Sequence, residues 1–522
     1  MVCPHAEMTT AFRPRPLDRY TQIGDLAETV RWVVQRSLLP ISVILLGEIV
    51  FLFFSGSRGT GAFAMIAVGT VIVLGVWRTR GIGLPLVPLI AIQNLIVYAL
   101  PIVIGHEVLA SYPENYITKA GLELLIFSCS LVGAWLVGME VFRPASALSY
   151  ALQGFDREGS SRLKRLGLTL ITGSSLYLLC QSLNLLGFIF TTLPDGSYSL
   201  ITTLVSATGA CGFFLVSMFV GTRGLSLGGR AFFWALLAGN CFISAAGFLL
   251  SATTALLASV LIGLFWSTGR MPWRYLAIVV LILSYLNLGK ITMRERYWNP
   301  EGDSAPLFTL VQMPRYYTEW IQASYEAMVP DHRHESVLDE QSNPKKTQSL
   351  LERVNNLQNL LFVIDAMDRA HIPPLYGETY ALIPPLLAPR IFWPEKPRTH
   401  EGQIRLNVHF GRQDLESTFQ TYVAWGLLPE AYGNFGEKAG AIFLGVCLGL
   451  FFAWIENFTA QKLLLSLEGF LAFSILLGLV GSFEMVASVL ITSVFQSMIV
   501  LVIATAFFVE PMILQRPEAG PS

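Results

Sequence analysis

The sequence predicts an all-α integral membrane protein that crosses the membrane many times. Of its 522 residues, 53% are hydrophobic and only 14% are charged, whereas a soluble globular chain carries about 25% charged residues. The mean hydropathy is +0.55. Apolar residues recur in runs long enough to cross the ~30 Å hydrocarbon layer as helices. One long polar segment, residues 293–438, interrupts these runs.

We expect about twelve transmembrane helices, nine in residues 38–292 and three in residues 439–509. They cover 38–54, 60–77, 84–105, 119–142, 166–193, 198–222, 231–250, 252–268, 274–292, 439–456, 467–483 and 486–509. Residues 1–37 hold five arginines and lack the apolar core of a signal peptide, so they are expected to be a cytoplasmic tail. Residues 510–522 form the other expected tail.

The distribution of Lys and Arg predicts the side that each loop faces. With the N-terminus inside, the cytoplasmic side holds eighteen basic residues, and the short outer loops hold only Arg58 and Lys119. Basic residues concentrate on the cytoplasmic side of membrane proteins. Both termini are therefore expected in the cytoplasm and segment 293–438 outside. The formal net charge of −1 gives no indication of a nucleic-acid partner.

The long segment contains one predicted amphipathic helix, at 350–370. Its apolar stripe comprises Leu350, Val354, Leu357, Leu361 and Ile364, at helical spacing. The opposite, polar face is expected to carry Asn355, Asn356, Asn359, Asp365 and Arg369. Such a helix needs an apolar partner, either the membrane interface or the outer ends of the bundle.

Positive charge is concentrated locally in a segment that is acidic as a whole. Residues 293–438 hold fourteen basic and nineteen acidic residues, but 389–412 hold five basic and two acidic ones. Arginine binds phosphate oxygens through two parallel hydrogen bonds and stays charged. These arginines therefore suit an anionic group at headgroup depth. The alternative is that they only reach toward lipid phosphates, as interfacial Arg and Lys commonly do.

The sequence argues against metal or nucleotide chemistry. The histidines of the long segment lack H-x-x-x-H or H-E-x-x-H spacing, and no phosphate-binding G-x-x-x-x-G-K-[ST] loop occurs. Five of the six cysteines lie in expected helices and the sixth in the tail, which excludes a disulfide framework in segment 293–438. No metal or other cofactor is expected.

Two blocks of the long segment carry a family resemblance. They are "RVNNLQNLLFVIDAMDRAHIPPLYGETYALIPPLLAPRIFWPEKP" at 353–397 and "STFQTYVAWGLLPEAYGNFGEKAG" at 417–440. Together they resemble the bacterial oligosaccharide repeat-unit polymerases, the O-antigen (Wzy-type) and exopolysaccharide polymerases. The most specific parts are "PRIFWPEKP" and "GLLPEAYGNFG"; Pro429 stands where the pattern favours a small or apolar residue.

The resemblance implies a GT-C-like glycosyltransferase of the bacterial inner membrane that acts on polyprenyl-diphosphate-linked oligosaccharides. Cationic groups must hold the diphosphate as charge builds on it, and a base must take the proton of the attacking sugar hydroxyl. We assign the first role to Arg390, Arg398 and Arg405, with Arg294 or Arg296. Glu430 or His400 is the candidate base. The alternative for Glu430 is a charge that complements a helix N-terminus.

The resemblance leaves two further functions open. A ligase would move finished glycan from the same lipid diphosphate to another acceptor, and a flippase or transporter would move lipid-linked oligosaccharide across the bilayer. A chain-length regulator and a repeat-unit flippase are the protein partners that a polymerase implies. Its product would be O-antigen, capsule or exopolysaccharide.

Overall fold

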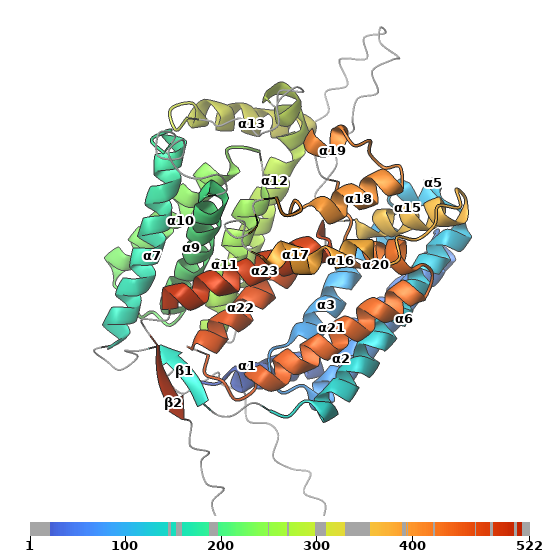
Figure 1. Ribbon diagram of the computed structural model, residues 1–522, viewed down its shortest axis with the longest axis horizontal. Helices are drawn as coiled ribbons and strands as arrows, with labels where there is room; N and C mark the ends of the chain where they lie inside the picture. The colour runs from blue at the N-terminus through green and yellow to red at the C-terminus, as the bar shows by residue number, and fades with distance from the viewer. Residues whose placement is uncertain are drawn as a thin grey trace, which may run out of the picture.

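The computed structural model describes most of the chain as helices (Figure 1). The described residues are 21–144, 148–152, 159–186, 197–248, 250–268, 271–297, 309–328, 355–388, 393, 395–420, 423–464, 466–480, 484–505 and 509–513. Among them, seven helices are long and apolar enough to cross a membrane, and three shorter apolar helices accompany them. The chain is a polytopic membrane protein.

Nine of the expected runs precede the long segment, and each contains a helix. The elements of this part are α1 (Ile23–Phe54), α2 (Thr60–Arg80), α3 (Leu86–Asn94), the π-helix η1 (Leu95–Ala99), α4 (Leu100–Val103), α5 (Val108–Ser111), α6 (Glu114–Val141), β1 (Leu148–Leu152), α7 (Gly159–Ser182), α9 (Ser197–Gly221), α10 (Leu227–Ala245), α11 (Leu250–Thr268) and α12 (Trp273–Tyr297).

The long segment folds into short helices, and the last three expected runs follow it. The elements are α13 (Met313–Met328), α15 (Asn356–Asp368), α16 (Glu378–Ala381), α17 (Ile383–Leu387), α18 (Glu401–His409), α19 (Ser417–Gln420), α20 (Leu427–Phe435), α21 (Ala439–Thr459), α22 (Leu467–Val480), α23 (Ala487–Thr505) and β2 (Val509–Ile513).

The first helix begins earlier than the sequence predicted. It starts at Ile23 instead of residue 38, because its first turn packs against the turn that follows α21. The Ile23 amide donates to the Lys462 carbonyl at 2.9 Å, and the Leu464 amide donates to the Thr21 carbonyl at 2.8 Å. Hydropathy alone placed the start too late, since this first part of α1 is stabilised by tertiary contacts.

The helices pack in two groups that α22 and α23 connect (Figure 1). One group contains α1, α2, α3, α6 and α21, with α6 packed against both α2 and α21. The other contains α7, α9, α10, α11 and α12, with α9 packed against α7 and α11. α13 lies across the end of α12, and there a second, smaller core forms around Phe248, Met293 and Trp320.

The two ends of the bundle differ. β1 and β2 pair antiparallel at one end, with Leu148 opposite Ile513 and Leu152 opposite Val509. Of the helices of the long segment, α13, α15, α18 and α19 lie toward the opposite end, and α16 and α17 lie beside α23 (Figure 1). Residues 293–438 thus build their described structure on one side of the apolar helices.

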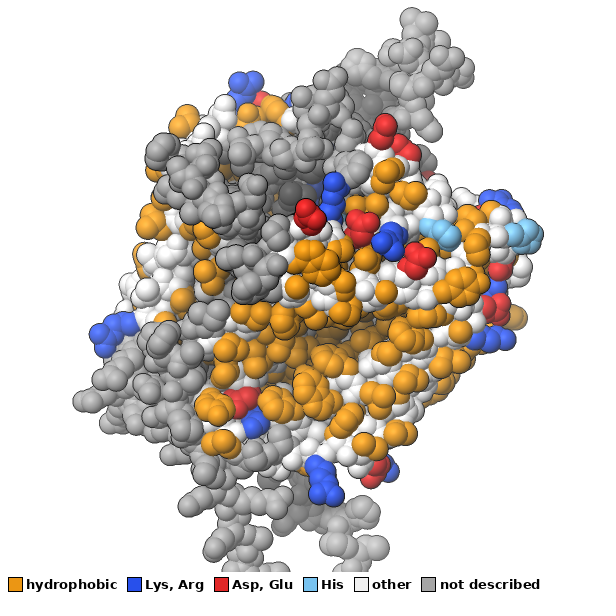
Figure 2. Space-filling view, viewed as in Figure 1, with side chains coloured by type: hydrophobic (Ala, Val, Ile, Leu, Met, Phe, Trp, Pro, Cys, Tyr) orange, Lys and Arg blue, Asp and Glu red, His pale blue; other side chains and the backbone are white. Residues whose placement is uncertain are grey.

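The surface between these ends is apolar. Figure 2 shows a broad band of apolar side chains over α21, α22 and α23, with charged side chains along its upper and lower borders. On α21 the exposed members are Ile442, Phe443, Val446, Phe451 and Trp454. A band of this kind suits the hydrocarbon layer of a bilayer, where no water is available to solvate polar side chains.

Candidate functional site

The α15–α20 unit, residues 355–435, is built on α15. The Asn355 side chain accepts a hydrogen bond from the Gln358 amide at 2.9 Å and so begins the helix. Leu357, Leu361 and Ile364 of the predicted apolar stripe are buried. Leu350 and Val354 lie outside the described residues. α15 packs against α6, η1 and α20.

The asparagines of the predicted polar face of α15 are buried, whereas Arg369 at the end of that face is exposed. Asn355, Asn356 and Asn359 are all buried, at 8%, 3% and 6% exposure. The segment that leads into α20 covers them, so each amide must find partners inside the protein. Asn359 Nδ2 donates to the Asn356 side-chain oxygen and to the Trp425 carbonyl, both at 2.9 Å.

A half-buried guanidinium lies against these amides. Arg412 donates to Asn359 Oδ1 at 2.8 Å and to the Ala424 carbonyl at 3.2 Å. Its guanidinium carbon is 5.3 Å from the ring centroid of Phe362 and 5.7 Å from that of Trp425, within the range of cation–π attraction. Loss of hydration lowers the pKa of Arg412 to about 10, so the group remains charged at neutral pH.

Glu430 joins three separate parts of the chain. Its carboxylate accepts from the Thr379 hydroxyl at 2.7 Å and from the amide of Ala487, the first residue of α23, at 2.6 Å. Asn434 links the same groups by donating to Thr379 Oγ1 and to the Glu430 carbonyl. Gly440 permits the close packing of α21 on α20, since a Cβ there would lie 2.5 Å from the Ala431 carbonyl oxygen.

Glu430 is fully buried, and burial raises the pKa of its carboxyl to about 7. A group with this pKa has the proton affinity of a general base near neutral pH. Its oxygens are, however, engaged within the protein. The contact that the structure gives Glu430 is with the N-terminus of α23, which agrees with the alternative interpretation of a charge that complements a helix dipole.

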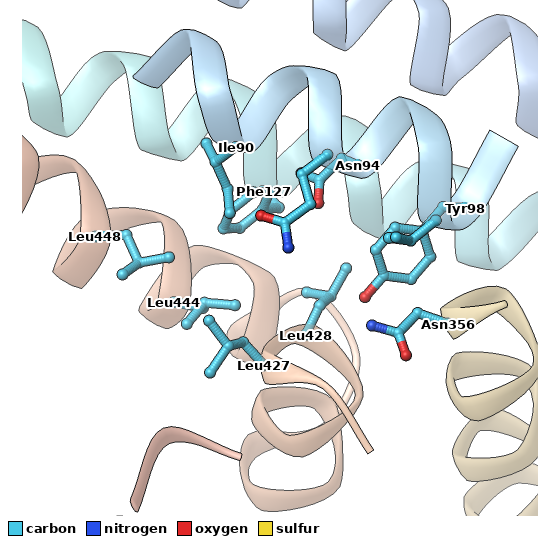
Figure 3. A pocket seen from close by; sticks show the side chains of 11 residues that line it. Ile90, Asn94, Tyr98, Phe127, Asn356, Leu427, Leu428, Leu444 and Leu448 are labelled. Atoms are coloured by element: carbon cyan, nitrogen blue, oxygen red, sulfur yellow. The ribbon is translucent and has the colours of Figure 1, made fainter. Parts of the chain in front are cut away.

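A small pocket lies between the α15–α20 unit and the apolar helices. Its cavity volume is about 30 Å³. Figure 3 shows Asn94, Tyr98 and Asn356 on one side of it and Leu427, Leu444 and Leu448 on another. The lining residues are Ile90, Gln93, Asn94, Val97, Tyr98, Phe127, Asn356, Leu427, Leu428, Leu444 and Leu448.

The backbone beside the pocket departs from α-helical geometry. α3 continues into the π-helix η1, which carries Val97 and Tyr98, and π-helical turns occur frequently at functional sites. The Tyr98 hydroxyl hydrogen-bonds to the Asn356 side chain. The pocket is therefore lined by amide and hydroxyl side chains on one side and by leucines on another.

The structure places the predicted cationic residues in two regions. Arg405 lies in α18, 3.4 Å from the Glu378 carboxylate and 3.8 Å from that of Glu401. Arg398 is exposed just before α18. Arg390 lies outside the described residues. Arg405 therefore already has carboxylate partners, which a diphosphate would have to replace.

Arg294 and Arg296 belong to the other region, at the end of α12. Arg294 donates through two nitrogens to the Phe248 carbonyl, at 3.0 and 3.2 Å. Arg296 lies 3.5 Å from the Glu319 carboxylate of α13. Their neighbours Met293 and Phe248 belong to the second core, whereas Leu406, next to Arg405, belongs to the main core.

His400, the second candidate base, occupies the N-cap position of α18. Its Nδ1 lies 2.8 Å from the Gln403 side-chain oxygen, and the residue is half-buried. It is thus nearer to solvent than Glu430. Within the described ranges, no group of three or more His, Cys, Asp or Glu side chains is placed to hold a metal ion.

Sequence reasoning missed the importance of Arg412, Asn356, Asn359 and Tyr98. Arg412 was counted only as one of five basic residues, and the sequence did not show that another segment covers the face that carries the asparagines. One signal was present: three asparagines in "NNLQN" at 355–359 are unusual for a solvated helix, since asparagine is a poor helix former. No protein-family model, no curated protein and no solved structure matches the chain.

Proposed function

We propose that this protein is a metal-independent glycosyltransferase that polymerises polyprenyl-diphosphate-linked oligosaccharide repeat units at the outer face of a bacterial inner membrane. The proposal includes a GT-C-like architecture of about twelve membrane-spanning helices with both termini cytoplasmic. Its product is a surface polysaccharide: O-antigen, capsule or exopolysaccharide. A lipid-linked oligosaccharide is the substrate, and a chain-length regulator and a repeat-unit flippase are the expected partners.

The observation that carries the proposal is the way the two resembling blocks meet. Residues 353–397 and 417–440 are separated in the chain, yet they join through Thr379, Glu430 and Asn434. The Leu375 and Tyr376 amides of the first block also donate to the Gly433 and Asn434 carbonyls of the second, at 3.0 and 2.8 Å. The described residues of the two blocks thus pack together as one unit against the apolar helices, whereas 353–354, 389–392, 394 and 421–422 lie outside the described residues.

The proposed reaction transfers a glycan from lipid diphosphate to a sugar hydroxyl. The hydroxyl oxygen of a new repeat unit bonds to the anomeric carbon of the growing chain. The bond from that carbon to the diphosphate breaks, and the diphosphate leaves with the electron pair. A base accepts the hydroxyl proton. Arginines stabilise the departing anion because their donors favour the charge that develops in the transition state.

In this proposal Arg390, Arg398 and Arg405 hold the diphosphate, with Arg294 or Arg296 as a further contribution. His400 is the more accessible base, since it is half-buried at the start of α18, while Glu430 is enclosed. Use of Glu430 as the base requires its bonds to Thr379 and Ala487 to open.

The test is the glycan profile of cells that carry Arg390→Ala. We expect long chains to disappear while single repeat units persist on the lipid carrier. A matched control is Arg369→Ala, whose side chain is 77% exposed and paired with Asp365 on α15. Normal chain length in the Arg390→Ala cells would contradict the assignment of Arg390.

Loss of the whole protein separates the alternatives. A polymerase leaves single repeats on polyprenyl diphosphate, whereas a ligase leaves full-length polymer stranded there. Purified protein that lengthens glycans in detergent, where there is no bilayer to cross, would eliminate a flippase or transporter.

A further inference from the structure

Arg412 differs from the other cations of the α15–α20 unit. Arg369 pairs with Asp365 at 2.7 Å, and Arg405 lies near Glu378 and Glu401. Arg412 is more enclosed, yet none of the described carboxylates forms an ion pair with it. The titratable side chain that acts on its charge is that of Tyr112, which is neutral at physiological pH. A buried charge is normally paired, because desolvation disfavours it.

The surroundings of Arg412 fix its orientation without neutralising it. The Asn359 oxygen and the Ala424 carbonyl each accept one of its N–H groups. A guanidinium has five N–H donors, so donors remain for a ligand. The rings of Phe362 and Trp425 lie within cation–π distance of the guanidinium and restrict its orientation. A rigid arginine with free donors suits an anion that accepts two parallel hydrogen bonds.

A chain of hydrogen bonds connects this guanidinium to the pocket. Arg412 donates to Asn359, Asn359 donates to Asn356, and Asn356 bonds to the Tyr98 hydroxyl. Asn356 and Tyr98 line the pocket beside Leu427 and Leu444 (Figure 3). Arg412 itself does not line the pocket, so this chain of hydrogen bonds is what connects its guanidinium to the pocket wall.

We propose that Arg412 is the central residue of a binding site for a phosphate-type anion, with Asn359 and Asn356 as the residues that position it. The inference rests on the proposed function in one respect: it identifies the anion as the diphosphate of a lipid-linked substrate. It adds a residue outside the predicted set of Arg390, Arg398, Arg405, Arg294 and Arg296. The same chemistry fits free pyrophosphate and a phospholipid headgroup.

The first test uses the unaltered protein in detergent. An arginine-specific reagent such as phenylglyoxal is applied with and without farnesyl diphosphate, and modification is read by peptide mass spectrometry. We expect Arg412 to react in the free protein and to be protected at least fivefold by the ligand. Arg369 is expected to react equally in both cases. Equal modification of Arg412 with and without ligand, or none in either, overturns the proposal.

The second test compares Arg412→Gln and Arg412→Lys with Arg369→Gln in binding assays, with thermal unfolding as the check on folding. We expect Arg412→Gln to weaken farnesyl diphosphate binding at least tenfold, Arg412→Lys to weaken it less, and Arg369→Gln to change it less than twofold. Unchanged binding in a folded Arg412→Gln protein overturns the site. If that variant unfolds, the protection experiment on the unaltered protein decides the question.

Three ligands distinguish the sources of the anion. Farnesyl diphosphate carries diphosphate on an isoprenoid, inorganic pyrophosphate lacks the lipid, and phosphatidylglycerol in nanodiscs offers an ordinary headgroup. Protection by farnesyl diphosphate at concentrations where the other two fail supports a lipid diphosphate. Protection by pyrophosphate alone or by phosphatidylglycerol alone would support an anion site at Arg412 and would contradict a lipid diphosphate as its ligand. If Arg412 binds farnesyl diphosphate but the purified protein does not lengthen glycans, the proposed polymerase activity is contradicted while the proposed anion site is supported.

Discussion

The α15–α20 unit and the α12–α13 corner both lie at the end of the bundle that carries the long segment, but they treat polar side chains differently. At the α12–α13 corner, Arg315 and Arg296 share the carboxylate of Glu319 near the surface. In the α15–α20 unit, Glu430 and the asparagines of α15 are buried and bond to distant parts of the chain.

The first arrangement attaches one helix to another, whereas the second holds buried polar side chains in a fixed geometry. Charges that pair at the surface contribute little to stability and leave no group poised for a ligand. A buried network is costly unless every member is satisfied, and it then fixes its side chains in one geometry. In the α15–α20 unit the Glu430 carboxylate and Asn359 have buried partners, whereas Asn355 Nδ2 and Asn407 Nδ2 are buried without a hydrogen-bond partner among the described residues. We infer from this concentration of buried polar groups that the unit is the better candidate for the functional site. The following predictions test the contrast.

Removal of the Glu430 carboxylate should have the largest effect. In Glu430→Ala, the Thr379 hydroxyl and the Ala487 amide lose their acceptor, and buried unsatisfied donors cost about 1–3 kcal/mol each. We expect the free energy of unfolding to fall by roughly 2–6 kcal/mol, measured in detergent. The matched control is Glu378→Ala, because Glu378 is 58% exposed. Equal losses in both variants would contradict the central role of Glu430.

The pH dependence of stability should depend on the same carboxyl. Burial raises the pKa of Glu430 from 4.5 to about 7, so the folded chain retains a proton there that the unfolded chain releases. Stability should therefore fall as pH rises through this window, by roughly 3 kcal/mol in all. Glu430→Gln should lack this contribution. Unfolding curves of both proteins between pH 4.5 and 8 test it, and parallel pH profiles would refute it.

Arg294→Ala should have an intermediate effect at the α12–α13 corner. The change removes two charged hydrogen bonds to the Phe248 carbonyl, and such bonds contribute about 1.5–3 kcal/mol. Phe248 has a φ of 57°, a conformation that needs support from its surroundings. Arg296→Ala is the control, since that side chain is 53% exposed, and its melting temperature should stay near that of the unaltered protein. Similar melting temperatures for the two variants would argue against an anchoring role for Arg294.

Arg405→Ala should have the smallest effect on stability. Its partners Glu378 and Glu401 lie at 3.4 and 3.8 Å on a partly exposed surface, and such pairs contribute less than about 1 kcal/mol. If Arg405 holds diphosphate, the variant should nevertheless lose long glycan chains. Thermal unfolding and glycan length, measured on the same variant, separate the two roles. A stable variant with normal chains would remove Arg405 from the site.

The positions of the apolar helices follow from the sequence. A backbone in hydrocarbon must satisfy its hydrogen bonds within the segment, so a long apolar run in a membrane is expected to form a helix. Each of the twelve expected runs contains a helix, and Leu357, Leu361 and Ile364 are buried as their spacing predicts. The start of α1 at Ile23 was missed because a contact with Lys462, far along the chain, stabilises its first turn.

The composition of the candidate site was decided by tertiary structure. Arg412 meets Asn359 across 53 positions of sequence, and Glu430 meets Ala487 across 57. Periodicity describes which residues share a face of one helix, but it carries no information about what packs against that face. The asparagines of α15 therefore looked solvated in sequence and became buried when the segment before α20 covered them. Local pattern determined the helices, whereas long-range packing determined which polar groups were removed from water.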